Sequence, residues 1–165
     1  MERLWAPWRM EYITSVNDTD PGCIFCDKPA ERKDKKNLIV YRSKACFVML
    51  NKFPYNNGHL MIVPYIHESE ITNLSDEILL DVHKTLNHCV RALKNTLNPH
   101  GMNIGLNLGR TAGAGIDTHI HYHLVPRWNG DTNFMPIIGA TKVVSEALDK
   151  TWKKLNSELK KLSGK

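Results

Sequence analysis

Three histidines, His119, His121 and His123, alternate with apolar residues in the C-terminal half of the chain. Successive side chains of a β-strand point to opposite faces, so a strand would place all three imidazoles on one face, about 6.6 Å apart. Ile120 and Tyr122 would then face the core. On a helix these histidines would be separated by about 200° per step and could form no common site. The pattern therefore predicts a strand over 118–127 that gathers three imidazoles.

Such a cluster of imidazoles indicates either a metal centre or nucleophilic catalysis. Burying three polar rings without partners would cost several kcal/mol, which disfavours a purely structural role. A catalytic metal triad normally needs another ligand and an open position for water. A nucleophilic imidazole needs its second nitrogen held by a hydrogen bond, and donors for developing negative charge. His59 and the glycine-rich loop 109–115 are candidate donors, because backbone N–H groups beside glycine approach a phosphate closely.

The four cysteines divide into a CxxC pair and two single residues. Cys23 and Cys26 form the pair, which in a cytosolic chain indicates metal binding or redox chemistry. No thioredoxin-like pattern surrounds them, so metal binding is the preferred interpretation. Cys46 lies in a predicted strand and Cys89 on the apolar face of a predicted helix. We expect both to be ordinary core residues.

Hydrophobic patterning predicts an α+β fold with a mostly antiparallel sheet. Strands are expected at 37–41, 45–50, 59–64, 102–108 and 118–127, and loops at 14–36 (with the CxxC inside it), 51–58 and 109–115. A central helix should follow an N-cap at Ser75 and end near Asn98. A second helix is expected in the tail, with apolar residues at Val144, Leu148, Trp152, Leu155, Leu159 and Leu162.

Composition places the chain among ordinary globular proteins. It has 165 residues, of which 42% are hydrophobic and 24% charged, and this excludes a disordered, collagen-like or coiled-coil chain. It has no apolar run of the roughly 18 residues that span a bilayer, and residues 1–8 lack the layout of a secretory signal. We therefore expect a soluble cytoplasmic protein with no membrane partner.

The net charge of +5 is concentrated in the tail, where residues 142–165 hold seven lysines and three acidic residues. A solvated helix face explains this excess best, and an anionic partner is the alternative. Aromatic residues are not interleaved with the basic ones as a nucleic-acid platform requires, so nucleic acid is not an expected partner.

The triad and its surroundings resemble the histidine-triad (HIT) family of nucleotide hydrolases and transferases. The resemblance spans most of the chain. It rests on Gly22–Cys26, Asn51, Gly58–His59, Pro64, His67, Asn107–Gly109, Ala112–Gly113, the triad, and Pro126–Trp128. The segments 4–13 and 126–134 are most similar to the bacterial branch of diadenosine tetraphosphate phosphorylase-like and hydrolase-like proteins.

The resemblance implies a single HIT domain over residues 1–165. It would comprise an N-terminal segment with the CxxC (1–36), a catalytic core (37–128), and a C-terminal extension with a helix (129–165). The sheet would have about five strands, and two chains would pair into a homodimer with a continuous sheet. The implied activity is cleavage of dinucleoside polyphosphates, diadenosine tetraphosphate in particular, through a covalent nucleotidyl-histidine intermediate that phosphate or water resolves.

Residue roles follow from the same resemblance. His121 would be the nucleophile, and His123 and His59 would contact the phosphates. Asn107 stands where related hydrolases carry a glutamine that bonds the leaving group. The implied substrate contacts are Asn51 at the ribose, the loop residues Gly113, Ala114 and Gly115, His123, and Trp128 at the base. The implied ligands of a structural zinc are Cys23, Cys26, His67 and His119; no organic cofactor is implied.

The chain departs from the phosphorylase pattern at one position. Ala114 follows Gly113 where the pattern has a serine that helps to hold the incoming phosphate. This leaves phosphorolysis and hydrolysis open as alternatives. A nucleoside phosphoramidase of the same fold is a further alternative, and Thr118 together with the long tail favours the polyphosphate substrate over it. A non-catalytic nucleotide-binding protein is the remaining alternative.

Overall fold

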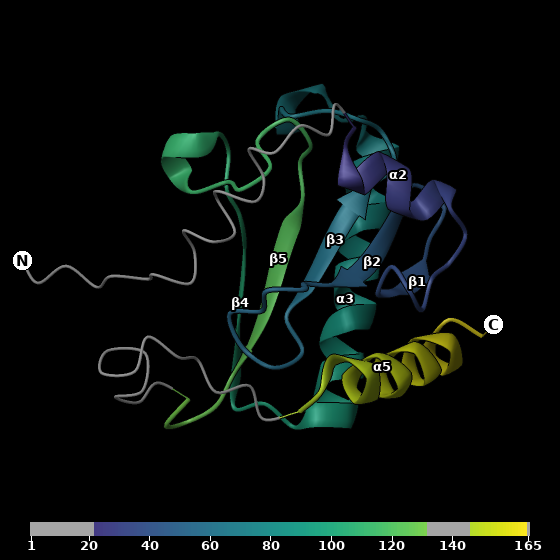
Figure 1. The fold of residues 1–165 in the computed structure, drawn as a ribbon, viewed down its shortest axis with the longest axis vertical. Helices are drawn as coiled ribbons and strands as arrows, with labels where there is room; N and C mark the ends of the chain where they lie inside the picture. Colours follow the sequence, from purple (N-terminus) through teal and green to yellow (C-terminus); the bar gives the residue numbers. More distant parts are fainter. Residues whose placement is uncertain (1–21, 132–145, 165) are drawn as a thin grey trace, which may run out of the picture.

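The computed structural model describes residues 22–131 and 146–164. A five-stranded antiparallel sheet in the order β1-β2-β3-β5-β4 forms its centre (Figure 1). The strands are β1 (Ile39–Arg42), β2 (Cys46–Leu50), β3 (Leu60–Pro64), β4 (Gly101–Leu106) and β5 (Tyr122–Arg127). The helices are α2 (Ile24–Ala30), α3 (Asp76–Leu97) and α5 (Leu148–Leu162), with 3₁₀ turns at Ile71–Asn73 and Arg110–Ala112. This confirms the predicted α+β architecture.

The helices α3 and α5 cover one face of the sheet, and α3 passes behind the strands in Figure 1. The main core lies between these helices and the sheet. It includes the fully buried residues Val48, Ile62, Leu124, Leu93 and Leu155. As predicted, α3 begins after Ser75 and ends at Asn98. Cys46 and Cys89 are buried in this core, as expected.

The opposite face of the sheet carries a smaller apolar cluster that includes Phe25, Phe47, Met49 and Met61. Strand register shows which side chains share this second face, because Met49 pairs with Met61 and Met61 pairs with His123. Alternate residues of a strand share a face, so His123 stands beside these methionines and away from α3. The face that carries His123 is therefore the one that α3 and α5 leave uncovered.

Helix α5 is attached to the edge strand β1 by side-chain hydrogen bonds. The Trp152 indole N–H donates to the carbonyl of Ile39 at 2.9 Å, and the Asn156 amide donates to the carbonyl of Val40 at 2.8 Å. The β1–β2 register shifts at this point, between Ile39 and Tyr41. Side chains of the C-terminal helix thus satisfy carbonyls of a strand that has only one neighbour in the sheet.

Two expectations about secondary structure were wrong. The segment 14–36 was expected to be loop, but Ile24–Ala30 form α2, with Cys23 at its N-cap and the buried Phe25 anchoring it. The polar residues and Pro29 of this segment obscured a short helix that one aromatic contact stabilises. In addition, β5 begins at Tyr122 instead of residue 118, so His119 and His121 precede the strand. The backbone there bonds elsewhere: the N–H of Ile120 donates to the carbonyl of Glu68.

Some expectations fall outside the described residues. The opening segment 4–13, residues 132–134 and the apolar position Val144 belong to this group, so the tail helix is described from Leu148 onward. Within the described parts of the chain, no helix combines the length and apolar character needed to cross a membrane.

Candidate active site

His121 is held as a neutral imidazole whose lone pair is on Nε2. Its Nδ1 lies 2.9 Å from the carbonyl oxygen of His119. A carbonyl oxygen only accepts, so Nδ1 carries the proton and Nε2 does not. Burial lowers the pKa of His121 below the ordinary histidine value, against the opposing effect of this hydrogen bond. The ring is therefore in the state that a nucleophile requires.

A second chain of contacts determines the tautomers of His59 and His123. The backbone N–H of Tyr55 donates to His59 Nδ1 at 3.1 Å. Since an N–H only donates, the proton of a neutral His59 is on Nε2, which lies 2.9 Å from His123 Nδ1. His59 Nε2–H then donates to His123 Nδ1, and the His123 proton is on Nε2. The result is a proton donor on His123 next to His121, whose ring centroid is 4.8 Å away.

Gly58 shapes the turn that delivers His59 to this position. Its φ is +74°, and a Cβ there would lie 2.5 Å from Leu97 Cδ1 on α3. A side chain at position 58 would meet both backbone strain and a steric clash. This glycine allows the loop to pack on α3 and His59 to be fully buried.

Two cavities meet at His123. The smaller, of about 110 Å³, is bordered by α2, the loop after β2, and the segment before β5. Its lining includes His121 and His123, together with Phe25, Met49, Asn51, Gly113 and Gly115. The larger cavity, of about 460 Å³, lies over β4 and β5 and includes Asn103, Asn107, Arg127 and Asp131. A ligand with two halves could therefore place one half in each cavity, with its middle next to the imidazoles.

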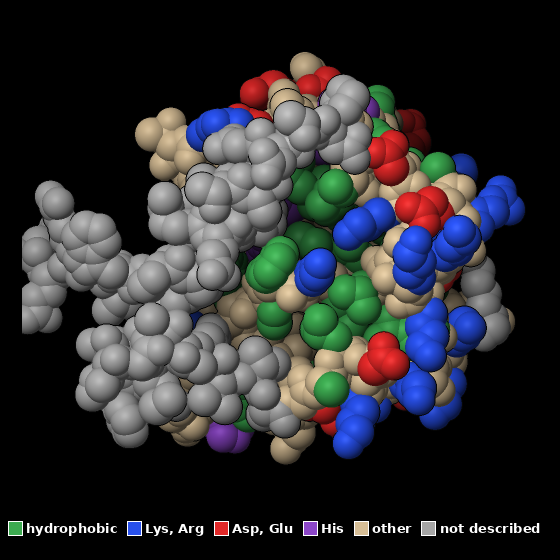
Figure 2. Space-filling model, viewed as in Figure 1, with side chains coloured by type: hydrophobic (Ala, Val, Ile, Leu, Met, Phe, Trp, Pro, Cys, Tyr) green, Lys and Arg blue, Asp and Glu red, His purple; other side chains and the backbone are tan. Residues whose placement is uncertain are grey.

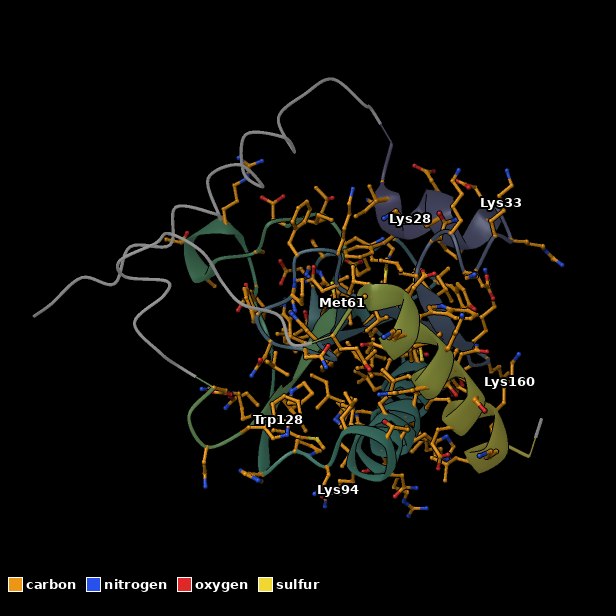
Figure 3. All side chains as sticks on the ribbon, turned by 60° about the horizontal axis from the view of Figure 1, so that its bottom comes forward. Lys28, Lys33, Met61, Lys94, Trp128 and Lys160 are labelled. Carbon is orange, nitrogen blue, oxygen red and sulfur yellow. The ribbon has the colours of Figure 1, made fainter. Side chains whose placement is uncertain are left out.

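Two lysines that the sequence analysis did not single out line the smaller cavity. Lys28 comes from α2 and Lys52 from the loop after β2. Burial lowers the pKa of Lys28, and the nearby charge of Lys52 lowers it further. Figure 2 shows basic side chains among the hydrophobic ones on this face, and Figure 3 places Lys28 on α2 beyond Met61. The cavity therefore offers positive charge that suits an anionic ligand.

Asn51 lies where β2 leaves the sheet, at the wall of the smaller cavity. Its backbone N–H donates to the carbonyl of His59 at 2.9 Å, which ties the two predicted site residues together. Its side-chain oxygen accepts the N–H of Phe53 at 2.9 Å. The amide is consequently oriented by the loop, with its NH₂ group as the remaining donor.

The glycine-rich loop reaches the site, but two of its amides are used within the loop. The N–H of Gly113 donates to the carbonyl of Arg110, and the N–H of Ala114 to the carbonyl of Gly109. Ala114 is buried and lines neither cavity, whereas Gly113 and Gly115 line the smaller one. The N–H groups of Gly113 and Ala114 are therefore already used inside the loop.

Asn107 and Trp128 differ in their relation to the cavities. The Asn107 amide donates to the carbonyl of Gly113 at 3.3 Å. Asn107 lines the larger cavity, as His123 does. Trp128 follows the end of β5, five residues and roughly 16 Å along the strand from His123. It lines neither of the two cavities, and Figure 3 shows it at the end of the sheet opposite Lys28.

The four predicted metal ligands converge in one place. One donor atom from each of Cys23, Cys26, His67 and His119 lies within 4.8 Å of all the others. The Cys23 and Cys26 sulfurs are 3.3 and 3.6 Å from His119 Nδ1, and the Cys26 sulfur is 3.4 Å from His67 Nδ1. His119 Nε2 donates to the carbonyl of Pro64 at 3.0 Å, so its lone pair is on Nδ1, the nitrogen that faces the sulfurs.

These donors fit a divalent soft metal. Two thiolates and two imidazoles are a usual tetrahedral set for zinc. Burial, then the hydrogen bond and charge of Cys23, raise the pKa of the Cys26 thiol to about 11. A bound cation would remove this penalty by compensating both thiolate charges.

Phe25, Tyr55, Asn56 and Asp131 also shape the site, and the sequence gave them no role. Phe25 packs against His119 and His121, with ring centroids 5.5 and 4.8 Å away. Tyr55 stacks on His59 at 4.9 Å. Phe25 lies between the cysteines of the CxxC and Asn56 lies close to His59, but an isolated aromatic or amide residue in a loop indicates nothing specific.

Comparisons with known proteins agree with this geometry. The HIT domain family matches residues 32–130. The chain is 39% identical to the AP-4-A phosphorylase of Mycobacterium tuberculosis over 96% of this chain and 84% of that protein. It is 28% identical to the adenosine 5'-monophosphoramidase of Candida albicans over 86% of this chain and 93% of that protein.

A solved structure gives the same fold. A Zn-bound histidine triad family protein from Mycobacterium smegmatis superposes with a TM-score of 0.70 at 24% identity, over 87% of this chain and 96% of that one. With the domain match over more than half of the chain and the relative at 39% identity, the conclusion is that this chain belongs to the HIT family.

Proposed function

We propose that this protein cleaves dinucleoside polyphosphates, with diadenosine tetraphosphate as the preferred substrate, by transferring a nucleotidyl group to His121. The observation that carries the proposal is the hydrogen bond from His121 Nδ1 to the His119 carbonyl, which keeps a neutral lone pair on Nε2. The AP-4-A phosphorylase relative supports this choice of substrate. The two cavities that meet at His123 suit a substrate with two nucleotide halves.

In the proposed mechanism, His121 Nε2 attacks the α-phosphorus of one nucleotide. A P–N bond forms, and the P–O bond to the rest of the polyphosphate breaks. The leaving group of diadenosine tetraphosphate is then ATP. The His123 Nε2–H donates to phosphate oxygens as negative charge develops, and His59 maintains that tautomer. Water or phosphate next attacks the adenylyl-histidine and restores the free imidazole.

The other contacts follow the cavity walls. Asn51 would bind the ribose, and Gly113 and Gly115 would border the phosphates beside Lys28 and Lys52. Asn107 would contact the leaving nucleotide from the larger cavity. The roles of Ala114 and Trp128 in substrate binding stay predictions, because neither residue lines the cavities as described.

The variant His121→Asn should lower kcat for diadenosine tetraphosphate by roughly a thousandfold or more, because no covalent intermediate can form. Nucleotide binding should remain, since the cavity keeps its shape. Turnover and isothermal titration with a non-hydrolysable analogue measure the two effects. His88→Asn, on α3 outside the site, is the matched control. Near wild-type turnover by His121→Asn would exclude the covalent mechanism.

Product analysis separates phosphorolysis from hydrolysis. Both routes should release ATP from diadenosine tetraphosphate, and added phosphate should change the second product from AMP to ADP. The ratio of ADP to AMP should therefore rise with the phosphate concentration. Chromatography of the nucleotides measures this ratio. An absence of any cleavage, with or without phosphate, would refute the proposed activity.

A phosphoramidase activity is the second candidate, and the adenosine 5'-monophosphoramidase relative favours it. The same nucleophile would attack a P–N-linked substrate, with an amine as the leaving group. The larger cavity would then have no nucleotide to hold. Faster turnover of an adenosine phosphoramidate than of diadenosine tetraphosphate would favour this alternative.

We also propose that the Cys23, Cys26, His67 and His119 cluster holds a structural zinc. The donor chemistry and the orientation of His119 Nδ1 support this assignment. Zinc would join α2 to the backbone segment that carries His121. All four donors would be protein atoms, and a closed site of this kind leaves no position for catalytic water.

Purified protein should contain close to one zinc per chain by mass spectrometry of the metal. Cys26→Ser should reduce the content below about half and lower the unfolding temperature, because a structural metal contributes to folding free energy. Cys89→Ser removes a thiol that is buried in the core outside the cluster and should keep the metal. Wild-type protein with less than half a zinc per chain, prepared without chelator, would contradict the assignment.

We further propose a homodimer that forms along β4. This strand is an edge of the sheet, pairing within the chain with β5, and its residue Ile104 is 51% exposed. An exposed edge strand offers unpaired backbone groups to another chain, and an apolar side chain there favours burial. Pairing of two β4 strands would produce one continuous sheet.

Light scattering coupled to gel filtration should give twice the chain mass, and Ile104→Lys should shift the protein toward the monomer. Leu80→Lys is the matched control, because Leu80 is similarly exposed but its neighbour Asp81 contacts the β1–β2 turn at the other edge. A monomeric wild type, or equal dissociation by both variants, would contradict pairing along β4.

Two broader assignments complete the proposal. We assign the whole chain to one domain, with residues 37–128 as the catalytic core between the CxxC segment (1–36) and the C-terminal extension (129–165). A cytoplasmic location stays a prediction, and it agrees with the nucleotide substrate that we propose.

A further inference from the structure

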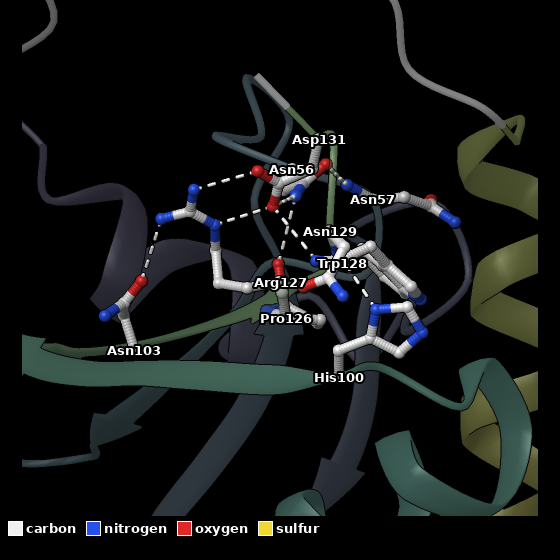
Figure 4. Close-up of polar contacts among 9 residues, drawn as sticks. All are labelled: Asn56, Asn57, His100, Asn103, Pro126, Arg127, Trp128, Asn129 and Asp131. Atoms are coloured by element: carbon white, nitrogen blue, oxygen red, sulfur yellow. Dashed lines mark hydrogen bonds and ion pairs between the residues drawn. The ribbon is translucent and has the colours of Figure 1, made fainter.

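The turn after β5 contains a buried carboxylate that the mechanism above does not use. Asp131 has a side chain only 7% exposed, although the Arg127 side chain that it pairs with is 43% exposed. Its oxygens accept hydrogen bonds from Arg127 Nε at 2.6 Å and Nη2 at 2.8 Å, and from the N–H of Trp128 at 3.1 Å. Figure 4 shows Asp131 at the centre of this network.

The network extends from Asp131 to the loop that carries the active-site contacts. The Asn56 amide donates to Asp131 Oδ2 at 2.7 Å and to the carbonyl of Pro126 at 3.1 Å. The carbonyl of Asn56 accepts the N–H of His59 at 3.2 Å. Both hydrogens of the Asn56 amide are thereby directed at the end of β5, and the loop 51–58 is attached to that strand.

The residue before Asn56 is Tyr55, whose N–H donates to His59 Nδ1. The Tyr55 N–H lies in the peptide unit before Tyr55, one residue away from Asn56. The two hydrogen bonds of the Asn56 side chain, together with the bond from the His59 N–H to the Asn56 carbonyl, hold this short turn and so restrict where the Tyr55 N–H can point. That N–H decides which nitrogen of His59 is protonated, and His59 decides the tautomer of His123. A backbone donor that moved away would allow either nitrogen of His59 to carry the proton.

We propose that Asp131 is a positioning residue: through Asn56 and the Tyr55 amide it holds His59 and His123 as the tautomers that place a proton donor against the substrate phosphate. The inference rests on the proposed function for its kinetic consequence, but the tautomers themselves are a property of the free protein. Arg127 supports Asp131 from the other side and donates to Asn103 on β4 at 3.1 Å.

A purely structural role for Asp131 would limit its effect to the turn that it closes. The Trp128–Asp131 turn also has its own backbone hydrogen bond, from the N–H of Asp131 to the carbonyl of Trp128 at 3.1 Å. Two variants separate the two roles. Asp131→Asn keeps the shape of the side chain but replaces one carboxylate oxygen by an NH₂ group. One of the N–H donors that now bond to Asp131 would then face another N–H. Asn56→Ala leaves the Arg127–Asp131 pair and the turn intact but cuts the connection to the loop.

Nitrogen-15 NMR of the imidazoles is the direct test, since protonated and unprotonated ring nitrogens have different shifts. In the wild type, His59 and His123 should each show a protonated Nε2 and an unprotonated Nδ1. In both variants these signals should move toward a mixture of tautomers. With diadenosine tetraphosphate, kcat should fall about tenfold or more while KM stays within about twofold.

The matched control is Asp34→Asn. Asp34 also receives a bidentate hydrogen bond from an arginine, Arg42, but it lies outside both cavities described above. Asp34→Asn should leave the tautomers of His59 and His123, and kcat, unchanged. Wild-type imidazole signals in Asn56→Ala, or equal losses of kcat in Asp131→Asn and Asp34→Asn, would overturn the inference. A wild type with the expected tautomers but no cleavage would refute the proposed function and leave the positioning role standing.

Discussion

The site depends on one constraint: a backbone carbonyl can only accept a hydrogen bond, and a backbone N–H can only donate one. The carbonyl of His119 accepts a hydrogen bond from His121 and so favours the tautomer with the proton on Nδ1, and the N–H of Tyr55 leaves the proton of His59 on Nε2. The imidazoles themselves are ambiguous, because either nitrogen can carry the proton. The fold resolves that ambiguity with main-chain groups, whose chemistry does not change with pH in the ordinary range.

The sheet and its loops supply these groups from separate elements. His123 is placed by its register with Met61, whereas His121 lies just before the strand, where its ring can turn back to the carbonyl of His119. In a regular strand both rings would project from the same face. The carbonyl of His119 would then accept a hydrogen bond from a neighbouring strand instead of from the His121 ring. The late start of β5 is consequently a requirement for the tautomer of His121, and irregular backbone is commonly found at functional sites.

Sequence patterns predicted the parts of the fold that depend on burial. The helix expected between Ser75 and Asn98 is present as α3, and the strand patterns predicted the antiparallel sheet. What the sequence could not predict depended on single long-range contacts. Phe25 stabilises α2 by packing against His119 and His121, and the Glu68 carbonyl bonds to Ile120 and delays β5. Of the residues expected at the site, Trp128 and Ala114 line neither cavity, since spacing along a chain does not determine which way a loop turns.

His119 connects the proposed metal cluster to His121, the proposed nucleophile. Its side chain lies in the cluster, and its backbone carbonyl contacts His121. Its side chain points Nδ1 at the Cys23 and Cys26 sulfurs, and its backbone carbonyl accepts a hydrogen bond from His121 Nδ1. The contacts of Nδ1 anchor the His119 side chain, and an anchored side chain limits how far the backbone that bears this carbonyl can move. The carbonyl of Pro64 restricts the same ring from its other nitrogen. The proposed metal cluster and the tautomer of His121 therefore both depend on the placement of one residue, His119.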